Sequence, residues 1–441
     1  MKKIIVLLVI LSATVFTAAQ TKPAPRSKSI AFNHVTVIDM TGKALRPDMT
    51  VIITGDRIST IGKTGQVRVP KGATVVDGRG KYLIPGFWDM HVHLDESGKG
   101  ASFPMYIANG VTGVRDMGGD FELISQWRQE SVRGNALTPR IIAAGPMLDG
   151  PGRGGSSRIT VNNAYEARQA VIDLKNRGVD FIKVHNRLSR EAYLAIADET
   201  KKQGIPLAGH VPFAVTPAEA SDAGQKSIEH LSRLPDLYDN EEAKTLFALF
   251  AKNDTWHDPT LVSGRAIAFL NDRDFTNDQR MQYIQPSVKE NWDDEINKFF
   301  KKRTPEAISA EKAYFQSSVK KVGALHRAGV RLMTGTDVGN PYVFPGFSLH
   351  DELALFVKAG LTPLEALQAA TSNPAEYLGL LDSFGTVEKG KIANLVLLEA
   401  NPLENIRNTQ KIGAVVLNGK LLPKELLQNK LSGAKAIANK K

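Results

Sequence analysis

The chain has 441 residues, of which 42% are hydrophobic and 23% are charged, as in an ordinary globular protein. It contains no cysteine, which excludes disulfides, thiolate zinc sites and cysteine nucleophiles. Any metal must therefore be held by His, Asp, Glu or a modified Lys. The net charge is +10, but no recognisable nucleic-acid-binding module accompanies it, so we expect no nucleic-acid partner.

The first 19 residues have the features of a signal peptide. Lys2 and Lys3 supply positive charge, residues 4–15 are apolar, and residues 17–19 are small enough for a cleavage site. The apolar run is short for a membrane-spanning helix, and no later segment is long and apolar enough to span. The sequence therefore predicts cleavage after Ala19, export to a periplasm or to the outside of the cell, and no stable membrane insertion.

Two stretches near opposite ends of the chain resemble series of short β-strands. In residues 28–83 and again in residues 384–425, apolar residues alternate with polar ones and glycines separate the runs. We therefore predict a small β-sandwich domain built from both termini. The basic tail that follows, residues 426–441, is expected to be solvated and mobile.

Between these stretches the pattern changes to repeated strand and helix. The candidate strands are residues 83–94, 111–117, 140–145, 179–185, 205–210, 226–230, 255–261 and 330–337. Amphipathic segments follow most of them, and Thr-Pro-x-Glu capping boxes at Thr216 and Thr362 predict two helix starts. Eight such units fit a (β/α)8 TIM barrel, the α/β fold that we predict for residues 84–383. Residues 265–304 have no strand signal and are expected to form a helical insertion.

Titratable side chains lie where these candidate strands end. His91 and His93 end the first strand, and side chains two residues apart in a strand point the same way. Later strands carry four further candidates at their ends: Lys183, His210, His230 and Asp337. Because function in such a barrel is built where the strands end, we expect these six side chains to form one metal site.

Lys183 is placed where it would face the interior of the predicted barrel. Burial disfavours the ammonium form of a lysine. A neutral amine can add carbon dioxide and become a carbamate, an anion whose two oxygens can bridge two metal ions. The alternative is a lysine that reaches solvent or pairs with an acid. We predict carboxylation of Lys183.

These motifs resemble those of the amidohydrolase superfamily over nearly the whole chain after the signal peptide. The matching pieces are residues 85–93, the Lys183 strand, His210, residues 227–230, residues 335–337 and residues 385–396. The chain is most similar to the branch with a carboxylated lysine, which includes prolidases, dipeptidases and ochratoxin-type amidases.

The resemblance implies a site with two divalent metal ions, expected to be Zn²⁺. The implied ligands are His91, His93 and Asp337 for one ion, His210 and His230 for the other, and carboxylated Lys183 as the bridge. A metal-bridging hydroxide is then expected to attack the amide carbon, while Asp337 accepts the water proton and passes it to the leaving nitrogen. The implied reaction is hydrolysis of an amide to a C-terminal amino acid, in a dipeptide, an N-acyl amino acid or an ochratoxin-like aryl amide.

One departure from the family pattern concerns the Gly-rich loop after the third strand. Related dipeptidases often carry a His there that polarises the substrate carbonyl, whereas this loop has Arg153 and no His. Arg153 could hold a substrate carboxylate or carbonyl, or it could be a solvated loop residue. Four residues near other strand ends are further candidates for contacting the substrate: His185, Arg187, His257 and Tyr342.

Two other functions remain open at the level of sequence. A cyclic-amide hydrolase resembling imidazolonepropionase would bind a single metal ion and would not need Lys183. A non-catalytic barrel that binds a metal or a solute would hold zinc and hydrolyse no amide. The exact substrate, the metal in the cell and homo-oligomer formation are not determined by the sequence.

Overall fold

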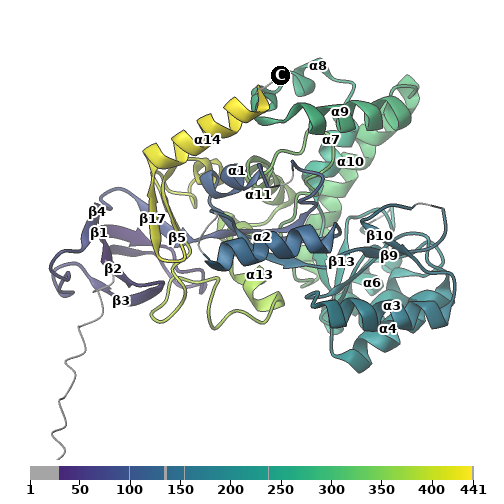
Figure 1. Cartoon of the computed structure of the whole chain (residues 1–441), viewed down its shortest axis with the longest axis horizontal. Coiled ribbons are helices and arrows are strands. Elements are labelled where there is room, and N and C mark those ends of the chain that lie inside the picture. The colour runs from purple at the N-terminus through teal and green to yellow at the C-terminus, as the bar shows by residue number, and fades with distance from the viewer. Residues whose placement is uncertain (1–28, 99, 134–136, 153, 237, 440–441) are drawn as a thin grey trace, which may run out of the picture.

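The computed structural model describes residues 29–98, 100–133, 137–152, 154–236 and 238–439 (Figure 1). The predicted signal peptide, residues 1–19, and Arg153 lie outside the described residues. The chain is an α/β protein with an additional β-sheet at one end, which carries β1 to β5 and β17 in Figure 1. Among the residues that the structure describes, no helix combines the length and apolarity needed to cross a bilayer.

The additional sheet joins strands from both ends of the chain. Its members are β1 (Ser29–Val37), β2 (Arg46–Thr54), β3 (Arg57–Lys63), β4 (Thr74–Asp77), β5 (Tyr82–Pro85), β15 (Leu395–Leu398), β16 (Ile412–Leu417) and β17 (Lys420–Pro423). Strand β15 runs antiparallel to β5, with Leu395 opposite Pro85, and this pairing connects the two halves. We predicted two sheets of a sandwich, whereas the hydrogen bonds form one sheet that branches at β1, because β1 pairs first with β4 and then with β5.

The central strands of this sheet bury both of their faces. In β15, Leu395 and Leu397 pack into the core of the additional sheet, whereas Val396 and Leu398 pack into the main core of the chain. Alternation with a period of two places these side chains on opposite faces of the strand. The additional sheet therefore packs through its β15 side chains against the part of the chain that carries the site.

The remaining strands are parallel and fall into two sheets. One contains β6 (Phe87–Val92), β7 (Val111–Asp116) and β8 (Arg140–Ala143). The other has the order β10 (Arg158–Thr160), β9 (Met147–Asp149), β11 (Ile182–Val184), β12 (Leu207–Gly209), β13 (Ser227–Glu229) and β14 (Trp256–Asp258). Strands β9 and β10 were not predicted from the sequence.

The eighth predicted strand, residues 330–337, does not form a regular ladder. Leu332 makes an isolated bridge to His257 in β14, and Val338 makes one to Val92 in β6. This segment therefore lies between the two parallel sheets and contacts an edge of each.

Helices connect and cover these strands. In chain order they are α1 (Phe103–Ala108), α2 (Phe121–Arg133), α3 (Ala164–Arg177), α4 (Arg190–Gln203), α5 (Pro217–Asp222), α6 (Glu241–Lys252), α7 (Leu261–Phe269), α8 (Arg273–Thr276), η1 (Gln279–Tyr283), α9 (Pro286–Glu295), η2 (Ile296–Phe300), α10 (Pro305–Arg327), α11 (Phe347–Ala359), α12 (Pro363–Ala369), α13 (Ser372–Tyr377), η3 (Ile406–Gln410) and α14 (Lys424–Ala438). The capping boxes at Thr216 and Thr362 are confirmed, since each threonine side chain accepts from the backbone N–H of the glutamate three residues later.

The basic tail is not the mobile segment that we expected. Residues 424–438 form α14, which packs against α1 and η1 and runs along one side of the molecule in Figure 1. Leu427 and Ala434 are buried in that contact. The lysines of the tail can remain solvated because the apolar side chains of α14 lie on its packed face.

Candidate metal centre

The six predicted metal ligands line one cavity of about 610 Å³: His91, His93, Lys183, His210, His230 and Asp337. They come from the ends of β6, β11, β12 and β13 and from the segment after Leu332. The imidazole rings are close together, with centroids 4.7 Å apart both for His91 and His230 and for His210 and His230.

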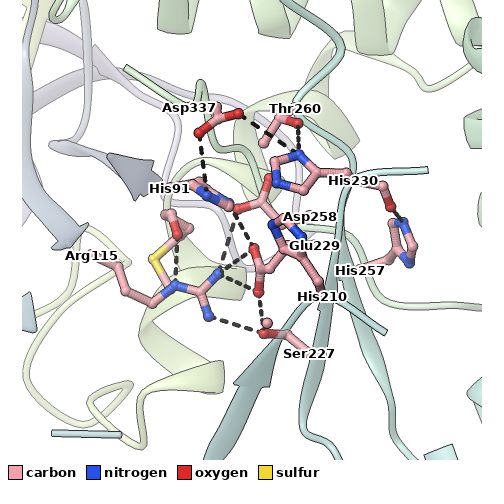
Figure 2. A network of polar contacts seen from close by, with 12 residues as sticks. His91, Arg115, His210, Ser227, Glu229, His230, His257, Asp258, Thr260 and Asp337 are labelled. Carbon is pink, nitrogen blue, oxygen red and sulfur yellow. Dashed lines mark hydrogen bonds and ion pairs between the residues drawn. The ribbon is translucent and has the colours of Figure 1, made fainter. Parts of the chain in front are cut away.

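Asp337 lies among three of the histidines. Its Oδ1 is 3.4 Å from Nε2 of His91, and its Oδ2 is 3.9 Å from Nδ1 of His230 (Figure 2). The same Oδ1 is 3.6 Å from Nε2 of His93. His91, His93 and Asp337 form a group whose ligand atoms are close enough to hold one metal ion. The backbone of Asp337 is left-handed, with φ of 63°, and its N–H donates to the carbonyl oxygen of His91. Such strain persists only where surrounding contacts enforce it.

Each histidine is held by a contact at its Nδ1 atom. The partners are Glu229 Oε2 for His91 (3.0 Å), the carbonyl oxygen of Gly118 for His93 (2.9 Å), Asn186 Oδ1 for His210 (2.8 Å) and Thr260 Oγ1 for His230 (2.6 Å). The partners of His91, His93 and His210 are acceptor oxygens, so Nδ1 of each of these rings carries a proton, whereas the Thr260 hydroxyl beside His230 can donate or accept. A ring whose Nδ1 is held in this way directs its Nε2 toward the cavity, as expected of a metal ligand.

Burial and nearby charges give His91 and His93 different protonation states: His91 is neutral and His93 is protonated. Burial, reinforced by the charge of Lys183, lowers the pKa of His91 to about 3, so this ring is neutral. Burial also opposes protonation of His93, but contact with Asp337 and the charge of Glu96 outweigh it and raise the pKa of His93 to about 10. The proton on His93 pairs with Asp337, and a metal cation could take the place of this proton.

Lys183 fits the predicted carbamate. Its side chain is 1% exposed, and its Nζ has no hydrogen-bond partner among the described residues. Burial outweighs the opposing charges of Glu229 and Asp337 and lowers the pKa of Lys183 to about 8, so the neutral amine that carboxylation requires is more populated than in an ordinary lysine. Gly209 is required beside it, because a Cβ there would lie 2.3 Å from the carbonyl oxygen of Val184 and 3.0 Å from Cδ of Lys183. A buried amine without a hydrogen-bond partner is costly, and conversion to a carbamate that binds metal ions would give this group partners.

The segment that carries Asp337 is tied to β6 by side chains. Asp89 accepts from the backbone N–H of Thr336 at 3.0 Å and from its hydroxyl at 2.7 Å. Gly335 lies so close to β6 and β14 that a Cβ would be 2.3 Å from Oδ2 of Asp258 and 2.6 Å from Cβ of His91. These contacts place Asp337 beside the histidines without a regular strand.

Comparison with known proteins identifies the family. The model of the Amidohydrolase family matches residues 82–422. The chain belongs to the Amidohydrolase family. Amidohydrolases are generally metal-dependent, in agreement with the group formed by His91, His93 and Asp337. The chain is therefore a hydrolase acting on amide or peptide bonds.

The relatives share only about a quarter of their residues with this chain, but the similarity extends over most of each chain. The chain is 25% identical to the ochratoxinase of Aspergillus niger over 395 residues, which cover 76% of this chain and 73% of that protein. It is 25% identical to the imidazolonepropionase of Pseudomonas entomophila over 381 residues, covering 79% and 87%. A solved structure of bottromycin amidohydrolase is similar, with a TM-score of 0.76 and 25% identity, covering 95% of this chain and 92% of that one.

Of the residues predicted to contact the substrate of this amidohydrolase, the structure describes four, and only one of these lines the cavity. His185 lines the cavity, and its ring centroid is 4.3 Å from that of His210. Arg187 is exposed and does not line the cavity. His257 is completely buried, with Nε2 2.6 Å from the carbonyl oxygen of His230, and so it supports the backbone of a predicted ligand instead of facing a substrate.

Tyr342 also lies away from the cavity. Its ring stacks on Trp292 of α9 at a centroid distance of 5.9 Å and packs close to Phe344. It belongs to the apolar contact between the helical insertion and the segment after Asp337. In this structure Tyr342 therefore contacts the helical insertion, and its contact with a substrate stays a prediction.

Sequence reasoning missed a buried network behind the amidohydrolase ligands. Arg115 donates through Nη2 to both carboxylate oxygens of Glu229, each at 2.9 Å, and through Nη1 to Ser227 (Figure 2). Its Nη1 also donates to the hydroxyl of Tyr377. Glu229 in turn holds His91. A signal for Glu229 was available, since it directly precedes His230 at a strand end, whereas nothing in the sequence pairs it with Arg115.

Proposed function

We propose that this amidohydrolase holds two divalent metal ions, with Zn²⁺ as the expected ion, and hydrolyses an amide bond to a C-terminal amino acid. The observation that carries the proposal is the buried, unpartnered amine of Lys183 in a cavity with four histidines and Asp337. A neutral lysine amine offers a single nitrogen donor, whereas a carbamate on Lys183 would supply two anionic oxygens, one for each ion. The similarity to an ochratoxinase supports the substrate class.

In the proposed arrangement, His91, His93 and Asp337 hold one ion, and His210 and His230 hold the other. Carboxylated Lys183 contributes to both. Divalent ions at such a site polarise a carbonyl oxygen and lower the pKa of water.

Asp337 is the proposed proton acceptor. Burial alone would raise its pKa, but the nearby His91 and His230 and the contact with His93 outweigh burial and hold the pKa well below its usual value. The carboxylate is therefore ionised, and Ser263 donates to its Oδ2 at 3.2 Å. Asp337 takes the proton released by water and passes it to the leaving nitrogen, which makes the amine a better leaving group.

We propose a (β/α)8 barrel as the architecture that brings these residues together. The bridges from Leu332 and Val338 connect residues 331–338 to both parallel sheets. On the other side, the backbone N–H of Asp180, just before β11, donates to the carbonyl oxygen of Ala143 in β8. Contacts at both junctions support a closed arrangement.

Export is a further proposal, resting on the N-terminal sequence alone. We propose that cleavage after Ala19 releases the enzyme into a periplasm or outside the cell. N-terminal sequencing of the protein recovered from the producing cells tests this, and an intact residue 1 would contradict it.

Metal analysis with a substrate screen tests the proposed reaction. We expect two ions per chain and hydrolysis of dipeptides or N-acyl amino acids. Because the chain is also similar to an imidazolonepropionase, a cyclic amide is the second candidate substrate. One ion per chain, with cyclic amides hydrolysed even after Lys183→Ala, would support that alternative. Bound zinc without hydrolysis of any amide would support a binding protein.

A further inference from the structure

Another cavity lies at the opposite end of the parallel strands from the predicted metal ligands. Its volume is about 230 Å³, and Pro206 and Lys226, which line it, directly precede β12 and β13. His210 and His230 directly follow the same two strands. Among the described residues, none lines both this cavity and the metal centre, so the two are separate.

Most of the wall of this cavity is apolar. Ile142 of β8, Phe181, and Leu378 and Leu380 after α13 line it, and they belong to one hydrophobic cluster. Covering such a wall releases water, so a ligand with an apolar group gains free energy here. The volume is below the roughly 300–1,000 Å³ of sites for drug-sized ligands, which favours a small ligand.

Two cationic side chains, Lys226 and Arg140, line the same cavity. Nζ of Lys226 donates to the carbonyl oxygen of Tyr377 at 2.5 Å and lies 4.6 Å from the centre of the Tyr377 ring. The guanidinium carbon of Arg140 lies 5.1 Å from the centre of the Phe384 ring. These contacts with neutral groups hold the two side chains without cancelling their charge. Partial burial lowers the pKa of both, because it removes water from the charged form.

The acids near these two cations are paired with other side chains. Asp180 lines the cavity, but its Oδ2 lies 3.0 Å from Nη1 of Arg128 and accepts from the backbone N–H of Ala143 at 2.8 Å. Asp254 attracts the lysine of the cavity, but it pairs with Arg331 at 3.4 Å. Neither cation forms an ion pair with any residue that the structure describes, so the cavity keeps an excess of positive charge.

We propose that this cavity binds a small carboxylate that carries an aromatic or branched apolar group and no amino group. Lys226 and Arg140 bind the carboxylate, because bonds between two ionised groups are the stronger hydrogen bonds. The apolar group covers the wall at Phe181, which an inorganic anion such as phosphate would leave bare. Both cations would repel an ammonium group on the ligand. This site is separate from the proposed hydrolysis and does not depend on it.

Titration of the zinc-loaded full chain with 4-fluorobenzoate, followed by ¹⁹F NMR, tests the proposal. We expect a Kd of about 1 mM or tighter. 4-Fluorobenzyl alcohol has the same ring without the charge, and 4-fluorophenylalanine adds an ammonium group, so both should bind at least about 10-fold more weakly. Inorganic phosphate at about 10 mM should not displace the benzoate, because it cannot cover the apolar wall.

Variants assign the binding to this cavity. Lys226→Met keeps the apolar stem and removes the charge, and it should weaken 4-fluorobenzoate binding by about 10-fold. Arg140→Met should weaken binding less, because Arg140 is more exposed to solvent. Leu380→Trp should abolish binding by filling the cavity while both cations remain. Lys244→Met is the matched control, since Lys244 is exposed on α6 and pairs with Glu241.

Several outcomes would overturn the proposal. They are a wild-type Kd above about 10 mM, equal binding of the alcohol, and unchanged affinity in Arg140→Met and Leu380→Trp, which remain informative if Lys226→Met does not fold. A loss of binding in Lys183→Ala with none in Leu380→Trp would place the acid at the metal centre and would also overturn it. Each of these results leaves amide hydrolysis untouched, so the proposed site and the proposed function fail independently.

Discussion

Glu229 Oε2 lies 3.0 Å from Nδ1 of His91, and the two side chains are 0% and 1% exposed. The carboxylate is itself held by Arg115 through two bonds of 2.9 Å. A buried arginine on β7 thus determines, through a glutamate on β13, which nitrogen of a β6 histidine faces the cavity. Partners of this kind orient a ligand ring and increase its basicity.

We predict that Glu229→Gln weakens zinc binding by about 10- to 100-fold, because His91 loses its charged acceptor. It should also lower the free energy of unfolding by up to about 3–5 kcal/mol, since buried Arg115 loses its nearest counter-charge and keeps only the longer contact with Asp258 at 3.6 Å. Competition with a chromophoric chelator and urea denaturation measure the two effects. Glu241→Gln, at a side chain that is 88% exposed, is the control. Unchanged zinc affinity would show that Glu229 does not orient a ligand.

Lys183→Ala should abolish the carbamate and lower activity by about 100-fold or more, because one ligand of both proposed ions is lost. In the presence of ¹³C-bicarbonate, the wild type should give a carbamate carbon signal by NMR that the variant lacks. Short carboxylates added to the variant should restore part of its activity. Lys202→Ala is the control, since Lys202 is exposed on α4. A carbamate signal that persists in Lys183→Ala would place the modification elsewhere.

Removing metal should lower both activity and stability. Zinc at about 1,000 times its dissociation constant stabilises a protein by about 4 kcal/mol per site, provided that the unfolded chain does not bind it. Dialysis against a chelator should therefore lower Tm and abolish hydrolysis, and added Zn²⁺ should restore both. A chelated, metal-free protein with full activity would refute metal dependence.

Thr336→Val should destabilise the segment that carries Asp337. The hydroxyl of Thr336 donates to Asp89 at 2.7 Å, and valine would leave that buried oxygen without a donor, at a cost of about 1–3 kcal/mol. Urea denaturation measures the loss, and activity should fall with it because Asp337 is adjacent. Thr245→Val on α6, at an exposed threonine, should change stability by less than about 0.5 kcal/mol.

We predict that the free energy of unfolding depends on pH through the buried carboxyl group of Glu352. It accepts from the backbone N–H groups of Leu261 and Val262, yet burial outweighs these bonds and raises its pKa from 4.5 to about 8. The folded state therefore retains a proton that the unfolded chain releases, so this contribution to stability falls as pH rises from about 4.5 to 8. Glu352→Gln should remove up to about 1.4 kcal/mol per pH unit of this slope. Equal slopes in wild type and variant would contradict the assignment.

The sequence by itself determined which residues could bind metal. His91 and His93 are two apart in a strand, and the period of a strand places them on one face wherever that strand lies. The absence of cysteine left His, Asp and modified Lys as ligands, and the structure brings all six predicted residues into one cavity. Local periodicity and chemistry sufficed because each ligand lies in or just after a segment that the pattern predicted as a strand.

Only the tertiary structure decided what surrounds those ligands. Arg115 meets Glu229, and Asp89 meets Thr336, across strands that are far apart in the chain, and no local pattern encodes such pairs. The burial of His257 and the packing of the basic helix α14 against α1 and η1 were likewise visible only in the structure. Burial, and with it pKa and the orientation of each imidazole, depends on which distant segments pack together, and this is a property of the whole fold.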